Sequence, residues 1–378
     1  MTAGATLVHL AFAPPGPAGA VEWEAPSVMW DKPPPGLLLD QSGEAFDPAR
    51  LQGGPRPSHA KRLECLRDVT LMWSDLFMVD GAVHAIYDGG AANAAARVAD
   101  HPELSRYTGL RRCGDGVAIP QSRLDGVHSH WGPVLFATSD EPHNWGLWLV
   151  YVLPAVVHFV RNRDRYQKLM VFCTHPNMRA FLALLGVREE DIIQHDCGAT
   201  YWFEELHVFR QSMRDLYIAP EAHALYRQLA RMMVARHGPG PHRAIYVARL
   251  RRTRELHSYR ALQNEQALAD RLAAEGYTVV EPEFMAVPDQ IRAFAGARRV
   301  VTLGGAGLFN TVFCDRARVM DIESTPWFVE AHSNIFAGTG LPYGLAIGRE
   351  DPADASPAHR RWSIDLDAAW PAIAAFMG

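Results

Sequence analysis

Short apolar runs separated by turn residues dominate the chain up to about residue 140. Residues 69–79, 82–88 and 132–138 have the length and hydrophobic content of strands. Residues 1–60 differ, because proline and glycine recur there in clusters such as APPGPAGA and DKPPPG. Such clusters interrupt regular structure, so we expect residues 1–60 to form an irregular arm with one or two strands.

From residue 143 the pattern changes, and long apolar segments alternate with short ones. The predicted elements are a helix over 143–162, a buried strand over 169–175, a helix over 178–187, and strands over 191–196 and 206–210. Alternation of strands and helices is typical of βαβ units, which build a parallel sheet.

A second alternating block begins near residue 220. It opens with an amphipathic helix over 221–238, which ends at a glycine followed by a proline. The strands predicted after it are 244–250, 278–283, 298–305 and 319–324, and the helices are 264–277, 287–297, 306–315 and one from 365 to the end.

Together the two blocks predict an α/β fold with two doubly wound, Rossmann-like domains that face each other across a cleft. A length of 378 residues suits two domains. The expected division is an arm over 1–60, an N-terminal domain over 61–215, a C-terminal domain over 216–350, and a tail with a helix over 351–378. In such sheets, ligands bind outside the carboxyl ends of the strands.

The composition is that of an ordinary globular protein, with 48% hydrophobic and 21% charged residues. A formal net charge of −5 argues against nucleic acid as a partner, since that usually requires a basic surface. The longest apolar run, 145–160, is short for a membrane span and contains Pro154 and His158, so we expect a buried helix. The first twenty residues lack a basic region, and we predict no signal peptide.

The cysteines are five in number and scattered, and none has the spacing of a zinc motif. We therefore expect no metal site and a cytoplasmic location, with peripheral attachment to the inner face of a membrane as the alternative. The cysteines are Cys65, Cys113, Cys173, Cys197 and Cys314.

A glycine-rich turn follows the strand predicted over 298–305. It contains Gly304, Gly305 and Gly307. Glycines after a strand let the backbone approach a ligand closely, and the next helix offers N–H groups and a positive dipole end. The turn suits a phosphate or the edge of a sugar, but a simple tight turn is an equally good interpretation, because the spacing matches neither GxGxxG nor a P-loop.

Arginines gather after the strand predicted over 244–250. The guanidinium group is a fixed cation whose planar donors match phosphate oxygens, which favours a pyrophosphate site over the alternative of a solvated basic loop. Asn264 and Glu265 then open the next helix, and Asn264 is a suitable N-cap residue. The arginines are Arg251, Arg252, Arg254 and Arg260.

In this order, the segments between 244 and 323 resemble the glycosyltransferase family 61 domain. The residues that carry this resemblance are Tyr246, Arg249, Asn264, Glu265, Glu281, Pro282, Glu283, Gln290, Ile291, Phe294, Ala297, Gly305, Ala306, Gly307, Leu308, Asn310 and Glu323. Upstream, the segment 144–149 with Leu153 and Pro154 is similar to a helix motif of the same family. The resemblance covers roughly residues 140–325.

The resemblance implies a GT-B fold, in which the C-terminal domain holds a nucleotide-diphosphate sugar and the N-terminal domain lies near a glycan or lipid-linked acceptor. It also implies inversion at the anomeric carbon without a cofactor or metal. Arg249 and Arg252 would contact the diphosphate, and Glu323 the ribose or sugar. The full set of expected donor-binding residues is Arg249, Arg252, Asn264, Glu265, Gly305, Ala306, Gly307, Leu308, Asn310 and Glu323.

Three polar positions of the family pattern are replaced in this chain. Gly304 and Leu147 stand where the family has histidines, and Tyr151 stands where it has an aspartate. Leu147 cannot transfer a proton, and Gly304 offers no side chain to a phosphate or as the base that inversion requires. The candidate replacements are His143 and Glu141, with Asp140 on the same loop and His128 and His130 upstream, and an exposed or structural role is the alternative for each.

Three functions follow from this comparison. The first is an inverting transferase that builds a surface polysaccharide. The second is a non-catalytic relative that binds nucleotide sugar or glycan and supports an active partner. The third is a nucleotide-sugar epimerase or hydrolase on the same fold.

Overall fold

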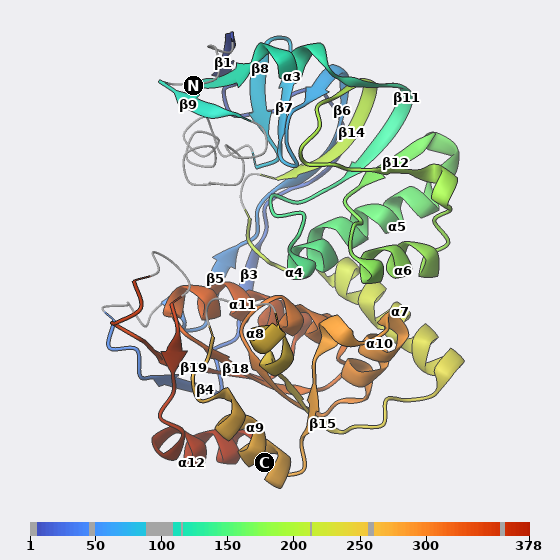
Figure 1. The fold of residues 1–378 in the computed structure, drawn as a ribbon. Helices are drawn as coiled ribbons and strands as arrows, with labels where there is room; N and C mark the ends of the chain where they lie inside the picture. Colours follow the sequence, from blue (N-terminus) through green and yellow to red (C-terminus); the bar gives the residue numbers. More distant parts are fainter. Residues whose placement is uncertain are drawn as a thin grey trace. The chain divides into compact units, whose positions relative to one another are not determined.

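The computed structural model describes residues 6–44, 50–87, 109–114, 116–211, 214–255, 261–355 and 360–378, with the backbone alone at 252, 255 and 326–328. The chain divides into two compact units (Figure 1). Unit 1 comprises residues 1–28 and 57–214, and unit 2 comprises residues 29–56 and 215–378. The chain passes from unit 1 to unit 2 for the last time between residues 214 and 215. The boundary expected from the sequence, 215/216, lies one residue further along.

One sheet forms the centre of unit 1. Its strands are β1 (Leu7–Phe12), β2 (Ala20–Ala25), β6 (Lys61–Leu71), β7 (Leu76–Val79), β8 (Ala82–Ala85), β9 (Arg111–Cys113), β10 (Gly116–Pro120), β11 (His128–Ala137), β12 (Lys168–Val171), β13 (Ile192–Gln194) and β14 (Tyr201–Gln211). They lie in the order β13-β12-β11-β14-β6-β7-β8-β1-β10-β9, and β2 pairs with β6.

Only part of this sheet is doubly wound. The strands β13, β12, β11 and β14 run parallel, whereas β6 is antiparallel to β14, β7 and β2. The antiparallel part is made by tight turns such as Asp80-Gly81, whose φ angles of 49° and 77° suit a two-residue hairpin between β7 and β8. A hairpin of this kind leaves no room for a crossover helix, so the expected Rossmann-like arrangement is limited to the four parallel strands.

The helices of unit 1 include the segment predicted over 143–162, which is helical but not uniform. Leu153 donates its N–H to Trp148 five residues back, and the turn over Trp148–Val152 is a π-helix. Pro154 has no N–H for the carbonyl four residues before it, which accounts for a wider turn at this point. The helices are α3 (Gln121–Asp125), α4 (Trp145–Leu147), η2 (Trp148–Val152), α5 (Leu153–Arg161), η3 (Arg163–Arg165), α6 (Pro176–Leu184) and η4 (Glu189–Asp191).

Unit 2 contains a wholly parallel sheet. Its strands are β15 (Ala244–Val247), β16 (Thr278–Val280), β17 (Arg299–Leu303), β18 (Arg318–Glu323), β19 (Tyr343–Ile347) and β4 (Leu37–Asp40), in the order β16-β15-β17-β18-β19-β4. Two small pairs accompany it, β3 (Met29–Lys32) with β5 (Gly54–Pro57) and β20 (Arg349–Glu350) with β21 (Trp362–Ser363).

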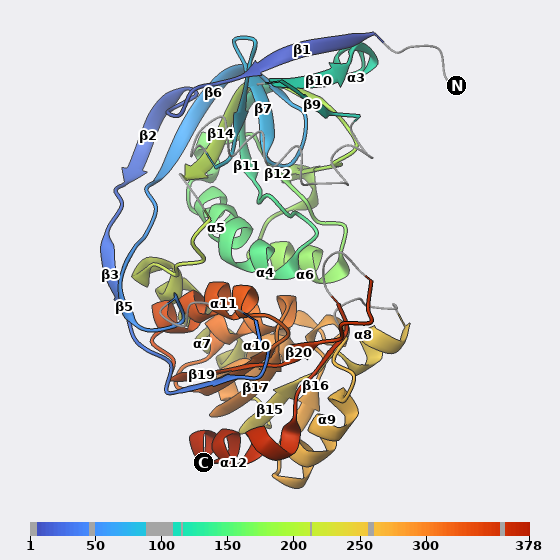
Figure 2. The same ribbon diagram turned by 90° about the vertical axis from the view of Figure 1, so that its left-hand side faces the viewer.

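Helices cover both faces of this parallel sheet. Figure 2 shows α9 and α12 on one face, and α7, α10 and α11 on the other. The first face is closed by a core in which Leu268, Leu272 and Ile373 pack against Tyr246 and Met320. The helices are α7 (Pro220–His237), α8 (Leu250–Glu255), α9 (Glu265–Ala274), η5 (Pro282–Phe284), α10 (Val287–Gly296), η6 (Ala306–Phe313), α11 (Pro326–Thr339) and α12 (Leu366–Met377).

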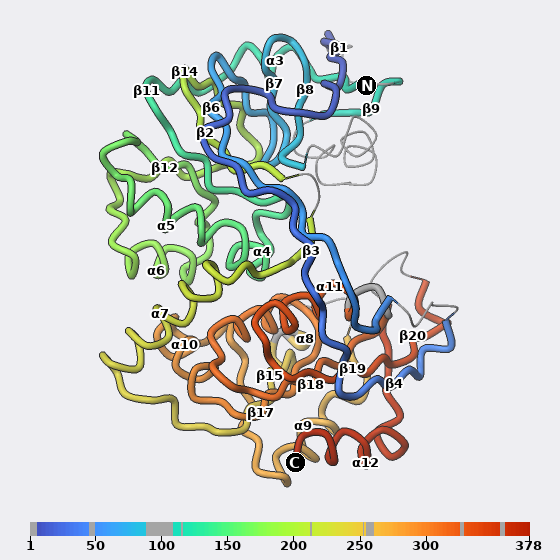
Figure 3. Tube along the Cα trace, turned by 180° about the vertical axis from the view of Figure 1, so that it is seen from behind, coloured from blue at the N-terminus to red at the C-terminus, as the bar shows by residue number. Residues whose placement is uncertain are grey.

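Residues 1–60 do not form a separate arm. β1 and β2 belong to the sheet of unit 1, and β4 pairs with β19 at the edge of the sheet of unit 2. Figure 3 shows β4 beside β19. Proline and glycine separate these short strands. Each strand is extended because it pairs with a strand from a distant part of the chain. In the described part of the chain, no helix is both long enough and apolar enough to cross a membrane.

Lys32 is a buried cation of unit 2. It is 1% exposed, and its Nζ donates to Ser333 Oγ on α11. Burial, together with the nearby charge of Arg56, lowers the pKa of Lys32 to about 8. The amine therefore costs stability whenever it is protonated.

We expect Lys32→Met to raise the free energy of unfolding near pH 7 by a few kcal/mol, since each pKa unit corresponds to about 1.4 kcal/mol. The pKa of Lys32 lies below its usual 10.5 in the folded chain, so the unfolded chain holds more protons between about pH 8 and 10.5. The wild type should therefore gain stability as pH rises through this window, and the advantage of Lys32→Met should shrink. Urea unfolding at several pH values measures this, with the exposed Lys168→Met as control. An advantage that stays constant with pH would contradict the assignment.

Candidate functional site

Unit 2 has a topological switch point between β15 and β17. The chain leaves β15 through α9 on one face to reach β16, and returns through α10 on the other face to β17 (Figure 2). Ligands of open α/β sheets bind outside the carboxyl ends of the strands at such a point. Arg249 follows β15 and Gly304 follows β17, so the two predicted segments meet at this edge.

Arg249 links the two strand ends. Its Nη1 lies 3.4 Å from the carbonyl oxygen of Gly304, and its backbone N–H donates to Glu265 Oε1 at 2.6 Å. Tyr246 Oη lies 3.4 Å from the same carboxylate oxygen. Burial raises the pKa of Glu265, although the hydrogen bond from Arg249 opposes this. Glu265 therefore holds the turn that carries Arg249, and its predicted contact with a donor stays a prediction.

The expected arginine-rich loop is partly helical, because residues 250–255 form α8. The guanidinium of Arg251 lies 3.9 Å from the centre of the Phe284 ring, and its backbone N–H donates to Glu281 Oε1 at 2.6 Å. Arg254 is exposed. The side chain of Arg252 and the whole of Arg260 lie outside the described residues.

The glycine turn has a backbone that only glycine adopts readily. Gly305 has φ 134° and ψ −175°. A Cβ on Gly307 would lie 3.2 Å from Val247 Cγ1, so this residue packs closely on β15. The turn continues as a 3₁₀ helix, whereas the pattern predicted an α-helix.

The part of the turn that solvent reaches is narrow. Gly305, Ala306 and Gly307 are half-buried, whereas Leu308 is buried and its N–H donates to Gly305 O at 3.1 Å. The N–H groups of Ala306 and Gly307 precede this first bond of the 3₁₀ helix, where a helix has no internal acceptors. These two, and not Leu308, are the N–H groups that the turn offers to a ligand.

Two predicted donor residues have structural partners. Asn310 is fully buried, and its Nδ2 donates to Gly307 O at 3.0 Å, which fixes the turn. Asn264 is at the N-cap position of α9 but makes no side-chain cap. Its Nδ2 instead donates to Ile364 O at 2.7 Å and anchors the segment before α12. A donor role for either residue stays a prediction.

Glu323 lies directly against Gly304. A Cβ on Gly304 would lie 1.4 Å from Glu323 Oε1 and 1.7 Å from its Cδ. The Glu323 side chain is buried, and its Oε2 accepts a hydrogen bond from Ser324 N at 3.0 Å. The carboxylate thus occupies the volume that a side chain at position 304 would need.

A histidine that the sequence analysis missed completes this cluster. His332 on α11 places Nδ1 3.1 Å from Asp321 Oδ2 and 3.9 Å from Glu323 Oε1. Asp321 and Glu323 are both on the same face of β18, because strand residues two apart share a face. α11 lies in a stretch for which no element was predicted, so nothing in the sequence pattern pointed to His332.

The candidate bases Glu141 and His143 belong to the loop after β11 in unit 1. Glu141 accepts hydrogen bonds from Asn144 Nδ2 at 3.0 Å and from Arg214 Nη1 at 2.8 Å. His143 is exposed, and its ring packs edge-on against Phe172 with centroids 4.3 Å apart. His143 is therefore accessible to solvent, whereas the Glu141 carboxylate is hydrogen-bonded to other side chains.

Asp140, the neighbouring candidate on this loop, has two partners that the sequence analysis missed, Arg214 and Tyr87. Asp140 is 2% exposed and lies 3.3 Å from Arg214 Nη1 and 3.0 Å from Tyr87 Oη. Burial lowers the pKa of Arg214, but the charges of Asp140 and Glu141 outweigh burial and raise it. These groups come from distant parts of the chain, and no local motif joins them.

The family model described as glycosyltransferase 61 matches residues 80–320, which include Arg249 and the glycine turn. The chain belongs to glycosyltransferase family 61. The resemblance inferred from the sequence is thus confirmed, and family membership places the chain among the glycosyltransferases. Glu323 lies three residues beyond the matched region. No curated protein matches the chain.

In this family 61 member, the three replaced positions have distinct surroundings. Leu147 is 2% exposed and packs in the core of unit 1. Tyr151 is half-buried in the π-helical turn. Gly304 is covered by Glu323, so a histidine there and the present conformation of Glu323 exclude each other.

We expect Gly304→Ala to destabilise the protein by about 1–3 kcal/mol, the usual range for overpacking. Glu323→Ala removes the atoms in conflict, so the double variant should be more stable than the sum of the two single effects by about 1 kcal/mol or more. Urea unfolding of the four proteins gives this coupling energy.

Gly305→Ala is the matched control for this cycle. Its cost arises from the positive φ of Gly305 and not from Glu323, so Glu323→Ala should not relieve it. Strictly additive effects of Gly304→Ala and Glu323→Ala would contradict the proposed steric conflict.

Proposed function

We propose that this family 61 member is an inverting glycosyltransferase with a GT-B arrangement of its two units. It would transfer a sugar from a nucleotide-diphosphate donor to a glycan or lipid-linked acceptor in the synthesis of a surface polysaccharide. The observation that carries the proposal is the meeting of Arg249 with the glycine turn at the switch point of unit 2. This edge combines a fixed cation with accessible backbone N–H groups, as a diphosphate requires.

The chemistry proposed for this edge is electrostatic. As the bond to the sugar breaks, negative charge grows on the leaving diphosphate, and Arg249 with the N–H groups of Ala306 and Gly307 would stabilise it. Arg252 follows Arg249 on α8 and is assigned to the same diphosphate. We assign no cofactor and no metal to this step.

The proposed base comes from unit 1. Inversion in a single displacement needs a group that takes the proton from the acceptor hydroxyl. His143 is the better of the two candidates, because its ring is exposed while Glu141 is held by Arg214 and Asn144. The proposed location is the cytoplasm, with attachment to the inner face of the membrane as the alternative, and nucleic acid is not a proposed partner.

A non-catalytic role is the second candidate function. It is favoured by Gly304, Leu147 and Tyr151, which leave three positions of the family pattern without their polar groups. In that case the switch point would bind a nucleotide sugar, or the protein a glycan, and the protein would support an active partner.

The deciding experiment is calorimetric titration with UDP-, GDP-, CMP- and dTDP-sugars, with and without Mg²⁺, followed by an assay for slow donor hydrolysis. Binding of one donor with slow hydrolysis supports the transferase. Binding without any turnover supports the non-catalytic role. If no donor binds, the transferase is wrong, and so is a non-catalytic role that depends on binding a nucleotide sugar.

For the donor that binds, Arg249→Ala should raise the dissociation constant about tenfold or more, the scale of one charge-assisted hydrogen bond. Arg249→Lys should recover only part of the loss, because an ammonium lacks the planar fork. Arg316→Ala is the control, since Arg316 is 81% exposed and precedes β18 at the opposite edge of the sheet. An unchanged dissociation constant for Arg249→Ala would remove Arg249 from the donor site.

A further inference from the structure

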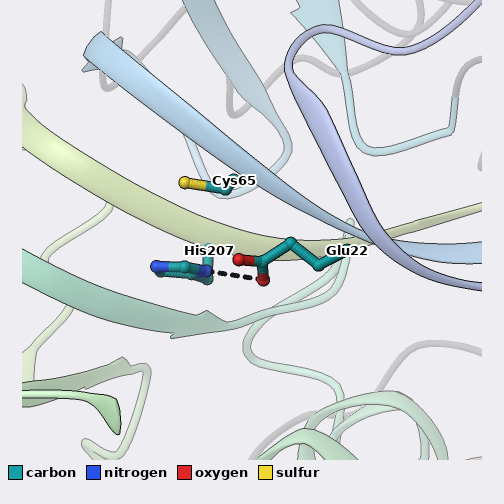
Figure 4. A group of neighbouring side chains, drawn as sticks. All are labelled: Glu22, Cys65 and His207. Carbon is teal, nitrogen blue, oxygen red and sulfur yellow. Dashed lines mark hydrogen bonds and ion pairs between the residues drawn. The ribbon is translucent and has the colours of Figure 1, made fainter.

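Three strands of unit 1 bring together a thiol, an imidazole and a carboxylate. Cys65 on β6, His207 on β14 and Glu22 on β2 each offer one ligand atom, and these atoms lie within 4.8 Å of one another. Figure 4 shows the Glu22 carboxylate directed at the His207 ring, with the Cys65 thiol on the neighbouring strand. All three residues lie in unit 1, whereas the proposed donor site lies in unit 2.

The register of the sheet explains this gathering. Cys65 and His207 are direct partners across β6 and β14, so their side chains share a face. The pairing of β2 with β6 is regular up to Val21 and resumes at Trp23, which leaves Glu22 as the extra residue of a bulge. A bulge redirects a side chain, and here it brings a carboxylate to the Cys65–His207 pair.

His207 is held in the manner of a metal ligand. Its Nδ1 lies 2.9 Å from Glu22 Oε2, and its Nε2 lies 2.9 Å from Glu205 Oε1. Histidines that bind metals usually donate the other ring N–H to a carboxylate, which fixes the tautomer and the ring orientation. Glu205 is itself held by Arg67, whose Nη2 lies 2.7 Å from Glu205 Oε2.

The charges of the site fit a divalent cation. Glu22 pairs with Arg165 through Oε1, and its other oxygen, Oε2, faces His207. The side chain of His207 is 3% exposed and that of Glu22 is 20% exposed, so the site is shielded on one side and reachable on the other. The carboxylates of Glu22 and Glu205 supply negative charge beside Arg165 and Arg67 at the rim. Burial and these carboxylates raise the pKa of the Cys65 thiol, so a metal would itself have to displace the thiol proton.

We propose that Glu22, Cys65 and His207 bind a zinc ion, with Glu205 as the positioning residue for His207. Thiolate sulfur, imidazole nitrogen and carboxylate oxygen are the ligands that zinc takes, and three protein ligands leave one position for water. Bonds of about 2.0–2.3 Å place ligand atoms within about 4 Å of one another, so small side-chain rotations would close the site. Zinc would replace the protons of the Cys65 thiol and of the Glu22–His207 hydrogen bond.

Zinc at this place would join three strands that are far apart in the sequence. Among the strands in the described part of the chain, β2 pairs with β6 alone, and it precedes the first passage of the chain into unit 2. The ion would fasten the bulge of β2 to both β6 and β14. Its expected role is therefore to secure the N-terminal part of unit 1.

The test uses the full chain without a histidine tag, stripped with a chelator and titrated with Zn²⁺ or Co²⁺. We expect one ion per chain, a thiolate-to-cobalt charge-transfer band, and a higher thermal midpoint with Zn²⁺. Cys65→Ser and Glu22→Gln should weaken binding at least tenfold, and Cys65→Ser should also remove the charge-transfer band. Glu205→Gln should weaken binding by about 10–100-fold, as for other carboxylates that orient a ligand.

Matched controls separate this site from others. Cys113→Ser removes an exposed thiol of the same unit, and Glu24→Gln removes a carboxylate of the same strand, and both should bind as the wild type does. In the wild type, Zn²⁺ should also protect Cys65 from a thiol reagent, a measurement that does not depend on the folding of any variant.

Two results would overturn the proposal. In the first, the wild type takes up no stoichiometric ion, or Cys65 stays equally reactive with Zn²⁺. In the second, Cys65→Ser and Glu22→Gln bind Zn²⁺ as tightly as the wild type, which would place the ion at an adventitious site.

Discussion

The close approach of Glu323 to Gly304 is the constraint on which the arrangement of the switch point depends. Because the carboxylate fills the space above the Gly304 Cα, the residue that follows β17 must lack a side chain. That residue supplies the carbonyl toward which Arg249 points, and Gly305, with its positive φ, turns the chain into the 3₁₀ helix. A larger residue at 304 would have to displace a buried acid, and the strand end and the start of the turn would move with it.

The same contact ties the edge of the sheet to α11. Glu323 and Asp321 point to the face that α11 covers, and His332 stands between them at 3.9 and 3.1 Å. The imidazole gives the buried Asp321 carboxylate a hydrogen-bond partner, which offsets part of the cost of burying it. A buried polar cluster of Asp321, Glu323 and His332 therefore lies behind the glycine turn, and Gly304 leaves the space that its Glu323 carboxylate occupies.

The elements predicted best from the sequence are those with a regular local pattern of hydrophobic residues. The alternating pattern from 221 to 324 predicted most strands of the parallel sheet and the helices that join them, because helices and strands differ in the spacing of their hydrophobic residues. It also brought Arg249 and the glycine turn to one edge, since the carboxyl ends of parallel strands meet there. β1, β2 and β4 were assigned to an irregular arm because proline and glycine mask short strands that depend on distant partners. The segment 306–313 has helical spacing, but its residues pack as a 3₁₀ helix against β15.

What the sequence could not provide is proximity between residues of different elements. Glu323 and Gly304 are nineteen residues apart, and the motif that contains Glu323 does not show that its carboxylate excludes a side chain at 304. Arg214 reaches Asp140 and Glu141 from the end of unit 1. Cys65, His207 and Glu22 have no spacing that suggests a metal, because a strand register and a bulge bring them together. Such sites depend on which strands pair and in which register, and a single sequence does not show that pairing directly.

The three replaced positions need not abolish activity, because a general base is not the largest contribution to the rate. A general base typically contributes about 10²–10⁴-fold to a rate, whereas stabilising the charge of the leaving group is usually the larger part. The groups that would do the latter, Arg249 and the N–H groups of Ala306 and Gly307, are present and oriented by Glu265 and Asn310. A chain with this edge intact and a weak base would still turn over, slowly. Loss of the three polar groups therefore predicts a reduced rate of transfer and not its complete loss. Measured turnover, more than donor affinity, distinguishes the transferase from the non-catalytic role.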